Sequence, residues 1–263
     1  MKHFLYSLIA LLQISFFSNT AQVGFNKVGY VTNIPNDSAL YYSVAVDSQG
    51  RIIVVGRTDF NNNNDDGLIA RFNTDGTLDT TFNGTGFINI EGATNSSVYN
   101  SVAIDNNGKI IVVGKADDNN GLIARFNTNG TLDATFNGTG FITNVPDSLI
   151  YLSVAVDNNG KILAVGQNDD FNGLIVRFNT NGTLDTTFNG TGFIANVLNN
   201  SSYYSAVAID SQGRIMAVGE TDNSDGILVR FLSNGVLDAE SNWNLKNFRE
   251  SKNINNVSIG ILG

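Results

Sequence analysis

The chain has 263 residues, of which 42% are hydrophobic and only 15% charged, and its formal net charge is -9. It has no cysteine, and its one histidine, His3, lies in a segment that we expect to be removed. This composition excludes Ser-His-Asp and Cys-His catalysis, zinc sites built from Cys and His, and disulfide bonds. No run of Lys or Arg occurs, so the clustered positive charge that nucleic-acid binding requires is missing.

The amino terminus has the pattern of a signal peptide. Lys2 and His3 precede an apolar stretch over 4–17, and small polar residues lead to a cleavage site after Ala21. The apolar stretch has 14 residues, fewer than the roughly 20 that span a bilayer. The sequence therefore predicts a signal peptide at 1–21, export to the periplasm, cell surface or medium, and no membrane insertion after cleavage.

The rest of the chain repeats itself four times. The segment from Tyr42 to Gly56 returns from Tyr99, from Tyr151 and, with one residue inserted, from Tyr203. One arginine marks the same place in each copy, at steps of 54, 52 and 53 residues: Arg71, Arg125, Arg177 and Arg230. A period near 50 is typical of propellers and solenoids.

Each repeat contains four runs that read as strands. In the first copy they are 43–47, 51–55, 68–73 and 86–89. Asp-Ser-Gln-Gly separates the first two runs and Asn-Thr-Asp-Gly follows the third, and both tetrapeptides favour tight turns between antiparallel strands. The sequence therefore predicts an all-β fold, a β-propeller of four blades with four antiparallel strands each.

The two ends of the repeat array complement each other. The fourth copy lacks the segment found at 187–193 and has an unrelated sequence at 240–246, whereas a similar segment occurs near the amino terminus at 25–31. We expect this N-terminal strand to complete the last blade and close the ring, because a lone propeller leaves no open edge. The propeller then covers 22–238 and a C-terminal tail covers 239–263. Four blades is the low end for propellers, so a fragment, or pairing with another chain, stays open.

The repeat resembles the delta-60 repeat, a propeller-type repeat of exported bacterial proteins. The resemblance rests on Leu78–Gly86, Val102–Gly114 and Ala124–Gly130, and it covers about residues 25–238. The fourth copy departs from it by lacking Thr-Phe-Asn-Gly. The resemblance implies a propeller and carries no catalytic residue to this chain. The order of the strands is also similar to that of NHL-type propellers, which implies that the first strand of each blade is innermost.

A binding face is predicted where the loops vary. In a four-stranded meander, the connections from second to third strand and from blade to blade lie at the same end of the blade. All length variation among these repeats falls in those connections. Loops that vary in this way commonly carry function. One position after the glycine that ends the second strand differs in every copy, while an aspartate two residues later recurs. The candidate ligand-binding residues are Arg57, Asp59, Lys115, Asp117, Gln167, Asp169, Glu220 and Asp222. The partner would be an extracellular glycan or protein; ordinary variation of solvated loops is the alternative.

Other patterns favour structural roles. Asn62-x-Asn64-x-Asp66 and Asn168-x-Asp170-x-Asn172 resemble half of a calcium loop, but no Glu follows at the twelfth position, so we expect polar turns and no cofactor. The repeated Arg should pair with an aspartate and brace the turn after the third strand. Those aspartates are Asp79, Asp133, Asp185 and Asp238.

Two alternatives concern aromatic and acidic residues. The tyrosines near the first strand of each copy could pack in the core or form a sugar-binding platform, and we favour the core: Tyr41, Tyr42, Tyr99, Tyr151, Tyr203 and Tyr204. A glycosidase needs a pair of carboxylates that breaks the repeat symmetry, and only Asp37, Glu91, Asp147 and Glu220 do so. We expect a non-catalytic binding or structural module, with a carboxylate-based glycosidase as the weaker alternative.

Overall fold

The computed structural model describes residues 25–32, 39–59, 65–90, 97–116, 120–143, 145–195, 197 and 202–238. The expected signal peptide at 1–21 and the tail at 239–263 lie outside these ranges. Within them, no helix is long and apolar enough to cross a membrane. The one helical element of these ranges is a 3-10 turn, η1 (Phe25–Lys27).

The described chain is built from four antiparallel sheets, one for each repeat. The first sheet has the order β1 (Ala39–Val46), β2 (Ile52–Asp59), β3 (Asp65–Phe72) and β4 (Phe87–Ile90). The second has β5 (Ser97–Ile104), β6 (Ile110–Ala116), β7 (Gly121–Phe126) and β8 (Phe141–Thr143). The third has β9 (Ser148–Val156), β10 (Ile162–Asn168), β11 (Gly173–Phe178) and β12 (Phe193–Ala195). The last has three strands, β13 (Ser202–Ile209), β14 (Ile215–Thr221) and β15 (Gly226–Phe231).

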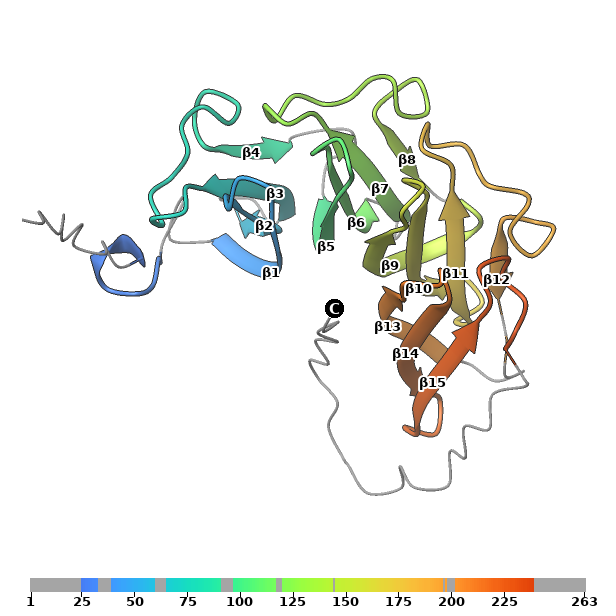
Figure 1. The fold of residues 1–263 in the computed structure, drawn as a ribbon. Helices are drawn as coiled ribbons and strands as arrows, with labels where there is room; N and C mark the ends of the chain where they lie inside the picture. Colours follow the sequence, from blue (N-terminus) through green and yellow to red (C-terminus); the bar gives the residue numbers. More distant parts are fainter. Residues whose placement is uncertain are drawn as a thin grey trace, which may run out of the picture.

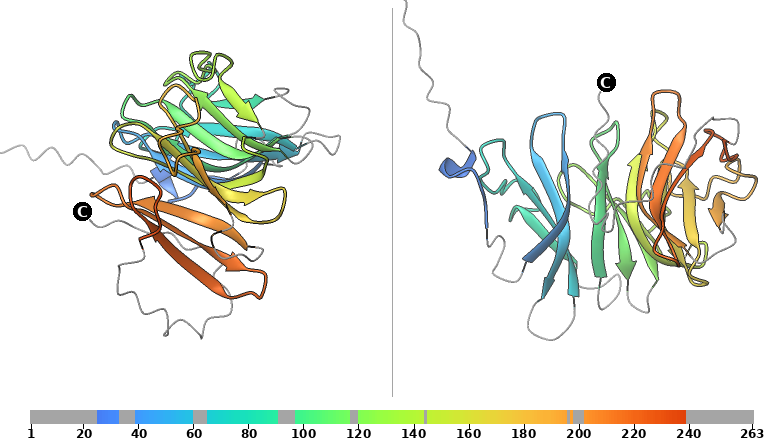
Figure 2. Two further views of the ribbon diagram at one scale, coloured as in Figure 1. Left: turned by 90° about the vertical axis from the view of Figure 1, so that its right-hand side faces the viewer. Right: turned by 90° about the horizontal axis from the view of Figure 1, so that it is seen from below.

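The blades stand side by side along an open arc (Figure 1). The first strands β1, β5, β9 and β13 face the centre of the arc, and β4, β8 and β12 lie outside, as the similarity to NHL-type propellers implied. Figure 2 shows the same blades from two further directions, with their strands running along the axis of the arc. The fold is therefore all-β and propeller-like.

The predicted turns form as expected. Oδ1 of Asp47 accepts hydrogen bonds from the backbone N–H groups of Gln49 and Arg51, both at 2.9 Å. Gly50 takes the left-handed conformation with φ of 76° that the turn requires. The same aspartate-led turn recurs in the other three blades. Side chain and backbone thus close the first hairpin of every blade in the same way.

The second strand is longer than predicted, because Gly56 does not end it. The strand continues to Asp59, and the pairing of β1 with β2 shifts register between Tyr41 and Ser43. A Cβ on Gly56 would lie 1.8 Å from the carbonyl oxygen of Leu40. The glycine is therefore required by the close approach of a β-bulge, and the prediction that it terminates the strand was wrong.

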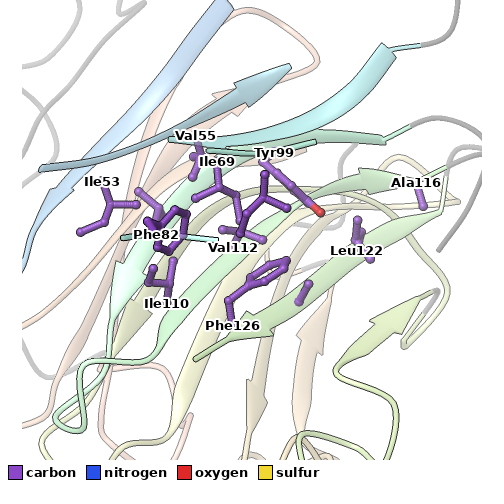
Figure 3. Packing of buried hydrophobic residues seen from close by; sticks show 13 residues of the cluster. Ile53, Val55, Ile69, Phe82, Tyr99, Ile110, Val112, Ala116, Leu122 and Phe126 are labelled. Carbon is purple, nitrogen blue, oxygen red and sulfur yellow. The ribbon is translucent and has the colours of Figure 1, made fainter. Parts of the chain in front are cut away.

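Three apolar clusters lie between neighbouring blades. Figure 3 shows the first cluster, in which Ile53, Val55 and Ile69 of the first blade meet Tyr99 and Val112 of the second. The second and third clusters repeat this arrangement at the next two junctions. Burying one such side chain contributes roughly 1.5–3 kcal/mol. The core is thus distributed over the junctions.

The arc is not closed within the described residues. The inner strands contact each other at three junctions, between β1 and β5, β5 and β9, and β9 and β13. The first and last sheets stand apart in Figure 1. Sheet pairing places no N-terminal strand beside β15 in the described part of the chain. The expected closing strand is therefore absent from the last sheet as described.

The N-terminal segment nevertheless has the local structure that its sequence predicts. Asn26 has φ of 45° and donates from Nδ2 to the carbonyl of Tyr30 at 3.1 Å, as Asn83, with φ of 52°, does to Phe87 at 3.3 Å. The N–H of Gly29 bonds to the carbonyl of Phe25 at 2.7 Å, as that of Gly86 does to Phe82. Residues 25–30 thus share these two hydrogen bonds and the left-handed asparagine with 82–87, although Gly84 has φ of 75° where Lys27 belongs to the 3-10 turn.

Candidate functional site

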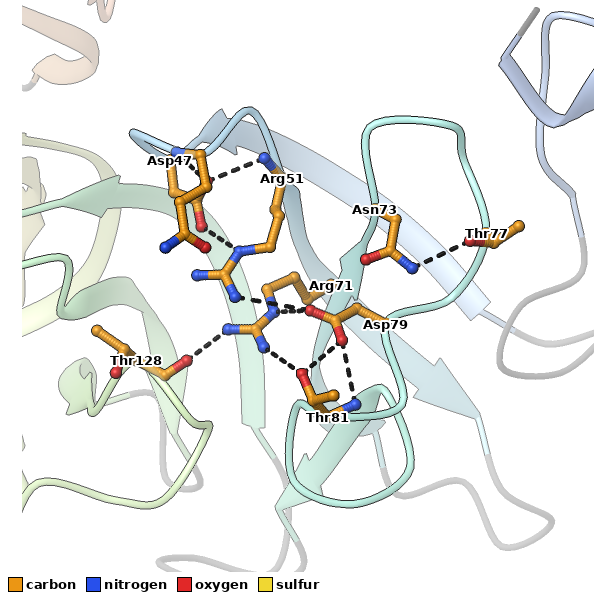
Figure 4. Close-up of polar contacts among 9 residues, drawn as sticks. Asp47, Arg51, Arg71, Asn73, Thr77, Asp79, Thr81 and Thr128 are labelled. Carbon is orange, nitrogen blue, oxygen red and sulfur yellow. Dashed lines mark hydrogen bonds and ion pairs between the residues drawn. The ribbon is translucent and has the colours of Figure 1, made fainter. Parts of the chain in front are cut away.

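The most extensive polar cluster is a repeated contact between blades. Nε of Arg71 lies 2.7 Å from Oδ2 of Asp79, and Nη1 donates to the carbonyl oxygen of Thr128 in the next blade (Figure 4). The guanidinium also stacks over the ring of Phe82, with its central carbon 4.6 Å from the ring centroid. Arg71 is only 2% exposed. The predicted ion pair is confirmed, and the arginine in addition joins two blades.

The same contact recurs along the chain. Arg125 pairs with Asp133 and Arg177 with Asp185, both at 2.7 Å, while Arg230 pairs with Asp238 at 2.8 Å. Arg125 and Arg177 also reach the carbonyls of Thr180 and Ser233 in the following blades and stack on Phe136 and Phe188. The sequence analysis missed the bridging and the stacking. The repeated Phe of Thr-Phe-Asn-Gly was the available signal.

The acidic groups of this contact remain ionised. Burial alone would raise the pKa of Asp133, but hydrogen bonds from Lys109, Thr135 and Arg125 outweigh it and hold the pKa well below its usual range. Lys109 Nζ lies 2.5 Å from the carboxylate. The pKa of Asp79 is likewise lowered, since hydrogen bonds from Thr81 and the charge of Arg71 outweigh burial. These carboxylates are structural anions, not proton donors.

The four loop-end candidates occupy matching positions in the sheets. Arg57, Lys115, Gln167 and Glu220 lie opposite the first residue of the apolar third-strand run, at Gly67, Gly121, Gly173 and Gly226. The structure therefore places them at the same end of the blades, but within strands rather than in loops. Each side chain is partly buried.

Gln167 and Glu220 each bond to another part of the protein. Gln167 donates from Nε2 to the carbonyl of Ser202 at 3.1 Å and to that of Phe171 at 3.3 Å. Glu220 accepts a hydrogen bond from the hydroxyl of Tyr203 at 3.0 Å. Burial, followed by this hydrogen bond and the charge of Glu220, raises the pKa of Tyr203. Gln167 therefore links the β10–β11 loop to the start of β13, whereas Glu220 bonds to its cross-strand neighbour in β13.

The aspartates that follow these positions are less uniform. Asp169 and Asp222 are exposed, and the N–H of Asp169 bonds to the carbonyl of Asp147 at 3.0 Å. Asp59 ends β2, while Asp117 lies outside the described residues. Of the symmetry-breaking carboxylates, Asp147 and Glu220 are described, and Asp37 and Glu91 are not.

One exposed aromatic residue at this end was not anticipated. Phe171 is 57% exposed and has φ of 61°, a left-handed conformation that bulky residues rarely adopt. Three hydrogen bonds hold its backbone: its N–H donates to Asn168, and its carbonyl accepts from Ser202 and Gln167. A phenylalanine among Asn and Asp residues in a loop was the sequence signal that could have identified it.

The segment of this blade that resembles half of a calcium loop is closed by its own hydrogen bonds. Asn168 Oδ1 accepts from the N–H of Asn172 at 2.8 Å, and the two backbones also pair. The first half-loop lies partly outside the described residues, which include Asp66 but neither Asn62 nor Asn64. Within the described ranges, no group of three acidic or histidine side chains is placed to hold a metal.

The tyrosines divide into two groups. Tyr99, Tyr151 and Tyr204 are each only 1% exposed, which confirms core packing for these three. Tyr41 and Tyr42 in the first blade are 37% and 47% exposed. Tyr41 pairs with Gly56 as Tyr99 pairs with Gly114, so it is the first-blade equivalent of the buried residues.

Two polar hollows lie at the opposite end, between neighbouring blades. One of about 540 Å³ separates the first two blades and is lined by Asp47, Gln49, Arg51, Arg71, Asn107 and Asn129, among others. Another of about 320 Å³ lies between the third and fourth blades and includes Asp157, Asn159, Arg177, Asp210, Gln212 and Ser233. Their walls are turn residues that the repeats share, which makes them products of blade packing.

Repeated four-stranded sheets, joined by the same contact around an arc, define a tandem-repeat β-propeller. The repeat described as "Domain of unknown function (DUF5122) beta-propeller" matches the chain four times, at 48–82, 106–136, 158–188 and 211–240. The chain therefore carries four DUF5122 β-propeller repeats, which confirms the resemblance to a delta-60-like repeat. Among curated proteins, no sequence matches it.

Solved propeller structures resemble the chain in fold. The WD40 propeller domain of Doa1 has 17% identity and a TM-score of 0.42, with 73% of this chain and 50% of that chain covered. A gluconolactonase from Xanthomonas campestris has 12% identity and a TM-score of 0.46, with 77% and 62% covered. An ulvan lyase has 10% identity and a TM-score of 0.43, with 72% and 54% covered. The chain thus spans between 50% and 62% of the length of these structures.

Proposed function

We propose that the protein is a non-catalytic binding module that holds a glycan at the loop end of its third and fourth blades. The observation that supports this most is Phe171, which presents its ring to solvent from a backbone held in a strained conformation. Backbone strain of this kind persists where the surrounding structure enforces it and clusters at binding sites. The loop thus displays an aromatic ring at a fixed position.

The neighbouring blade shows that the fold does not require an aromatic residue there. Ser224 has the same φ of 61°, and its N–H bonds to Thr221 at 2.9 Å as that of Phe171 bonds to Asn168. The loop closes equally with a small polar side chain. The phenyl ring of Phe171 is therefore an addition to the loop and contributes little to closing it.

The groups beside this ring suit a sugar. A sugar presents a C–H face, which can pack on an aromatic ring, and hydroxyls, which need donors and acceptors. The amide of Gln167 lies against the Phe171 carbonyl, and the Tyr203–Glu220 pair follows Ser202, whose N–H bonds to that same carbonyl at 3.0 Å. An exposed aromatic ring, in a loop whose backbone bonds to the Gln167 amide and to the residue before the Tyr203–Glu220 pair, supports glycan binding more than a charged ligand.

The carboxylate chemistry supports binding over hydrolysis. A glycosidase needs one carboxyl group with a raised pKa to act as the acid. Every described carboxylate with a clear pKa shift is shifted downward, and each is held by turn or inter-blade hydrogen bonds: Asp47, Asp75, Asp79, Asp133, Asp185 and Asp210. The carboxylate-based glycosidase is accordingly the weaker alternative.

Two further parts of the proposal concern the ends of the chain. Residues 1–21 direct export, which amino-terminal sequencing of the protein from its host would test. Residues 25–31 complete the last blade, in which the described residues form three strands. The two hydrogen bonds that they share with 82–87 support that role.

Glycan binding is tested by replacing Phe171 with the residue that the fourth blade already uses. On a glycan array, and then by calorimetry with the strongest hit, we expect the Phe171→Ser protein to bind at least tenfold more weakly. Its unfolding midpoint should not fall, since Ser224 adopts the same backbone. Leu232→Ser, which removes another exposed apolar side chain from a turn after β15, is the matched control and should bind normally. Equal binding by the Phe171→Ser protein would refute the site, and the absence of any glycan hit would refute the ligand class.

A further inference from the structure

We propose that the two open ends of the arc join those of a second copy of this chain, head to tail, so that two chains close one ring. This inference rests on the proposal that residues 25–31 complete an open blade, and is independent of the glycan. It concerns two surfaces. The first consists of the outer edge of β15 and the face around Gly226, and the second consists of the first blade and the segment 25–31.

The first surface is a strand edge that every other blade covers. In the first three blades the third strand pairs with a fourth strand, and the N–H groups of Arg71, Arg125 and Arg177 donate to Gly86, Gly140 and Gly192 at 2.9 Å. In the last blade, β15 has β14 on one side and no fourth strand within the described residues. A strand edge of this kind pairs readily with another chain.

The second surface carries a segment that fits this edge. In each of the three junctions, an Asn N–H donates to a turn carbonyl of the next blade: Asn83 to Asn129, Asn137 to Asn181 and Asn189 to Asn234, at 2.7–2.8 Å. The N–H of Asn26 makes the same bond to Asp75 of the first blade at 2.6 Å. Phe25 contacts Gly76 as Phe82 contacts Gly130. The first blade therefore already holds the outer segment of a blade that would precede it.

The inner parts of the two ends are also complementary. At the internal junctions a tyrosine packs against the glycine that begins the apolar part of the third strand, as Tyr99 does against Gly67 and Tyr204 against Gly173. These tyrosines and glycines are buried. In contrast, Tyr41 is 37% exposed and Gly226 is exposed. Val44, which corresponds to the buried Val102, is 60% exposed. Each end thus exposes residues whose counterparts are buried at the internal junctions.

A second copy satisfies these surfaces by repeating the junction that the chain already uses three times. The three internal junctions use the same hydrogen bonds. With these three junctions in place, the first and last blades still stand apart (Figure 1). Joining the ends within one chain would require every junction to bend further. Two copies related by a two-fold axis repeat the existing junction twice and close a ring of eight blades, a size within the usual range.

The junction between copies should be weaker than those within the chain. The hydroxyls of Ser97 and Ser202 accept a hydrogen bond from the N–H of Gly67 and Gly173, at 3.0 and 3.1 Å. Ala39 holds the matching position in β1, opposite Thr58, and cannot accept the bond from Gly226. We therefore expect a reversible dimer. Ala39→Ser should lower its dissociation constant about five- to a hundredfold, because each of the two identical junctions gains one hydrogen bond.

A disulfide test separates the possible outcomes. The pair Tyr30→Cys and Val229→Cys corresponds to Phe193 and Val176, which lie opposite each other in β12 and β11. Because the chain has no cysteine, the introduced thiols are its only ones. Under mild oxidation we expect a covalent dimer, made from two singly mutated chains mixed together as well as from the double mutant. The pair Val176→Cys and Phe193→Cys is the control, and should oxidise within one chain.

Each result has a defined meaning. A covalent dimer, together with a monomer–dimer equilibrium in sedimentation that Ala39→Ser strengthens, would support the proposal. A disulfide that forms within single chains of the Tyr30→Cys, Val229→Cys double mutant would overturn pairing with a second copy but leave the role of residues 25–31 standing. If the control pair oxidises and the test pair does not, the role of the segment fails as well. Glycan binding is scored separately and decides neither outcome.

Discussion

Replacing Arg125 with alanine should unfold the protein far more easily than the loss of an ordinary surface charge. The side chain is 6% exposed, pairs with Asp133 at 2.7 Å, reaches the Thr180 carbonyl of the third blade and lies 4.7 Å from the centroid of the Phe136 ring. Removing one member of a buried ion pair costs about 3–5 kcal/mol, because the other charge stays buried. Lys109 still neutralises Asp133, so we expect the lower limit, about 3 kcal/mol.

Urea unfolding followed by tyrosine fluorescence would measure this change in the free energy of unfolding. For a protein of this size, about 3 kcal/mol corresponds to a fall in the thermal midpoint of roughly 6–12 °C. The matched control is Arg214→Ala. Arg214 also pairs with an aspartate, Asp210, at 2.6 Å, but its side chain is 34% exposed, so its loss should cost below about 1 kcal/mol.

The free energies of unfolding of the two variants together test whether Arg125 joins the second and third blades. If Arg125→Ala costs no more than Arg214→Ala, the guanidinium does not join the second and third blades as described. If Arg125→Ala weakens glycan binding while leaving the free energy of unfolding unchanged, the arginine belongs to a ligand site, and its structural role is refuted.

Two other changes test the backbone and the charges. Gly114→Ala places a Cβ 1.8 Å from the Val98 carbonyl oxygen, and we expect the free energy of unfolding measured in urea to fall by at least about 3 kcal/mol. The control Gly138→Ala, at a position with φ of 76° and open space around it, should lower it by only about 1–2 kcal/mol. Equal losses in the two variants would contradict the close approach at Gly114. The lowered pKa values of Asp133 and Asp185 stabilise the fold above the unfolded pKa of 3.8, and this stabilisation is lost as the pH falls towards the folded values. The urea midpoint should therefore be steady above about pH 5 and fall below about pH 4, and the Asp133→Asn protein should show a shallower fall.

The strand content followed from the sequence because local chemistry determines it. The turn at Asp47 needs only residues four positions apart, and the conformation of Phe25–Tyr30 follows from an asparagine and a glycine that accept positive φ. The length of β2 did not follow from the sequence, because a glycine ends some strands and admits a bulge in others. Only the distance from Gly56 to the Leu40 carbonyl distinguishes these cases.

Features that depend on contacts between two blades were harder to predict from the sequence. The sequence predicted the pairing of Arg71 with Asp79, which are eight residues apart, but not its contact with Thr128, which is 57 residues away. Closure of the ring depends on the angle between blades, which no single repeat contains. Similarly, loop variation pointed to the end that carries Gln167 and Glu220, but the exposure of Phe171 required a structure.

The contact between Arg, Asp and the following turn has a consequence for how such a chain can evolve. Each repeat unit carries both halves of the contact, the Arg–Asp pair and the acceptor turn, so duplication of a gene segment copies what one further junction needs. The first and second copies differ at only two positions, Asp75/Asn129 and Thr80/Ala134, between 67–88 and 121–142. A new blade can therefore be inserted without compensating substitutions elsewhere, and selection can act on its loops while the inherited arginine keeps it in place.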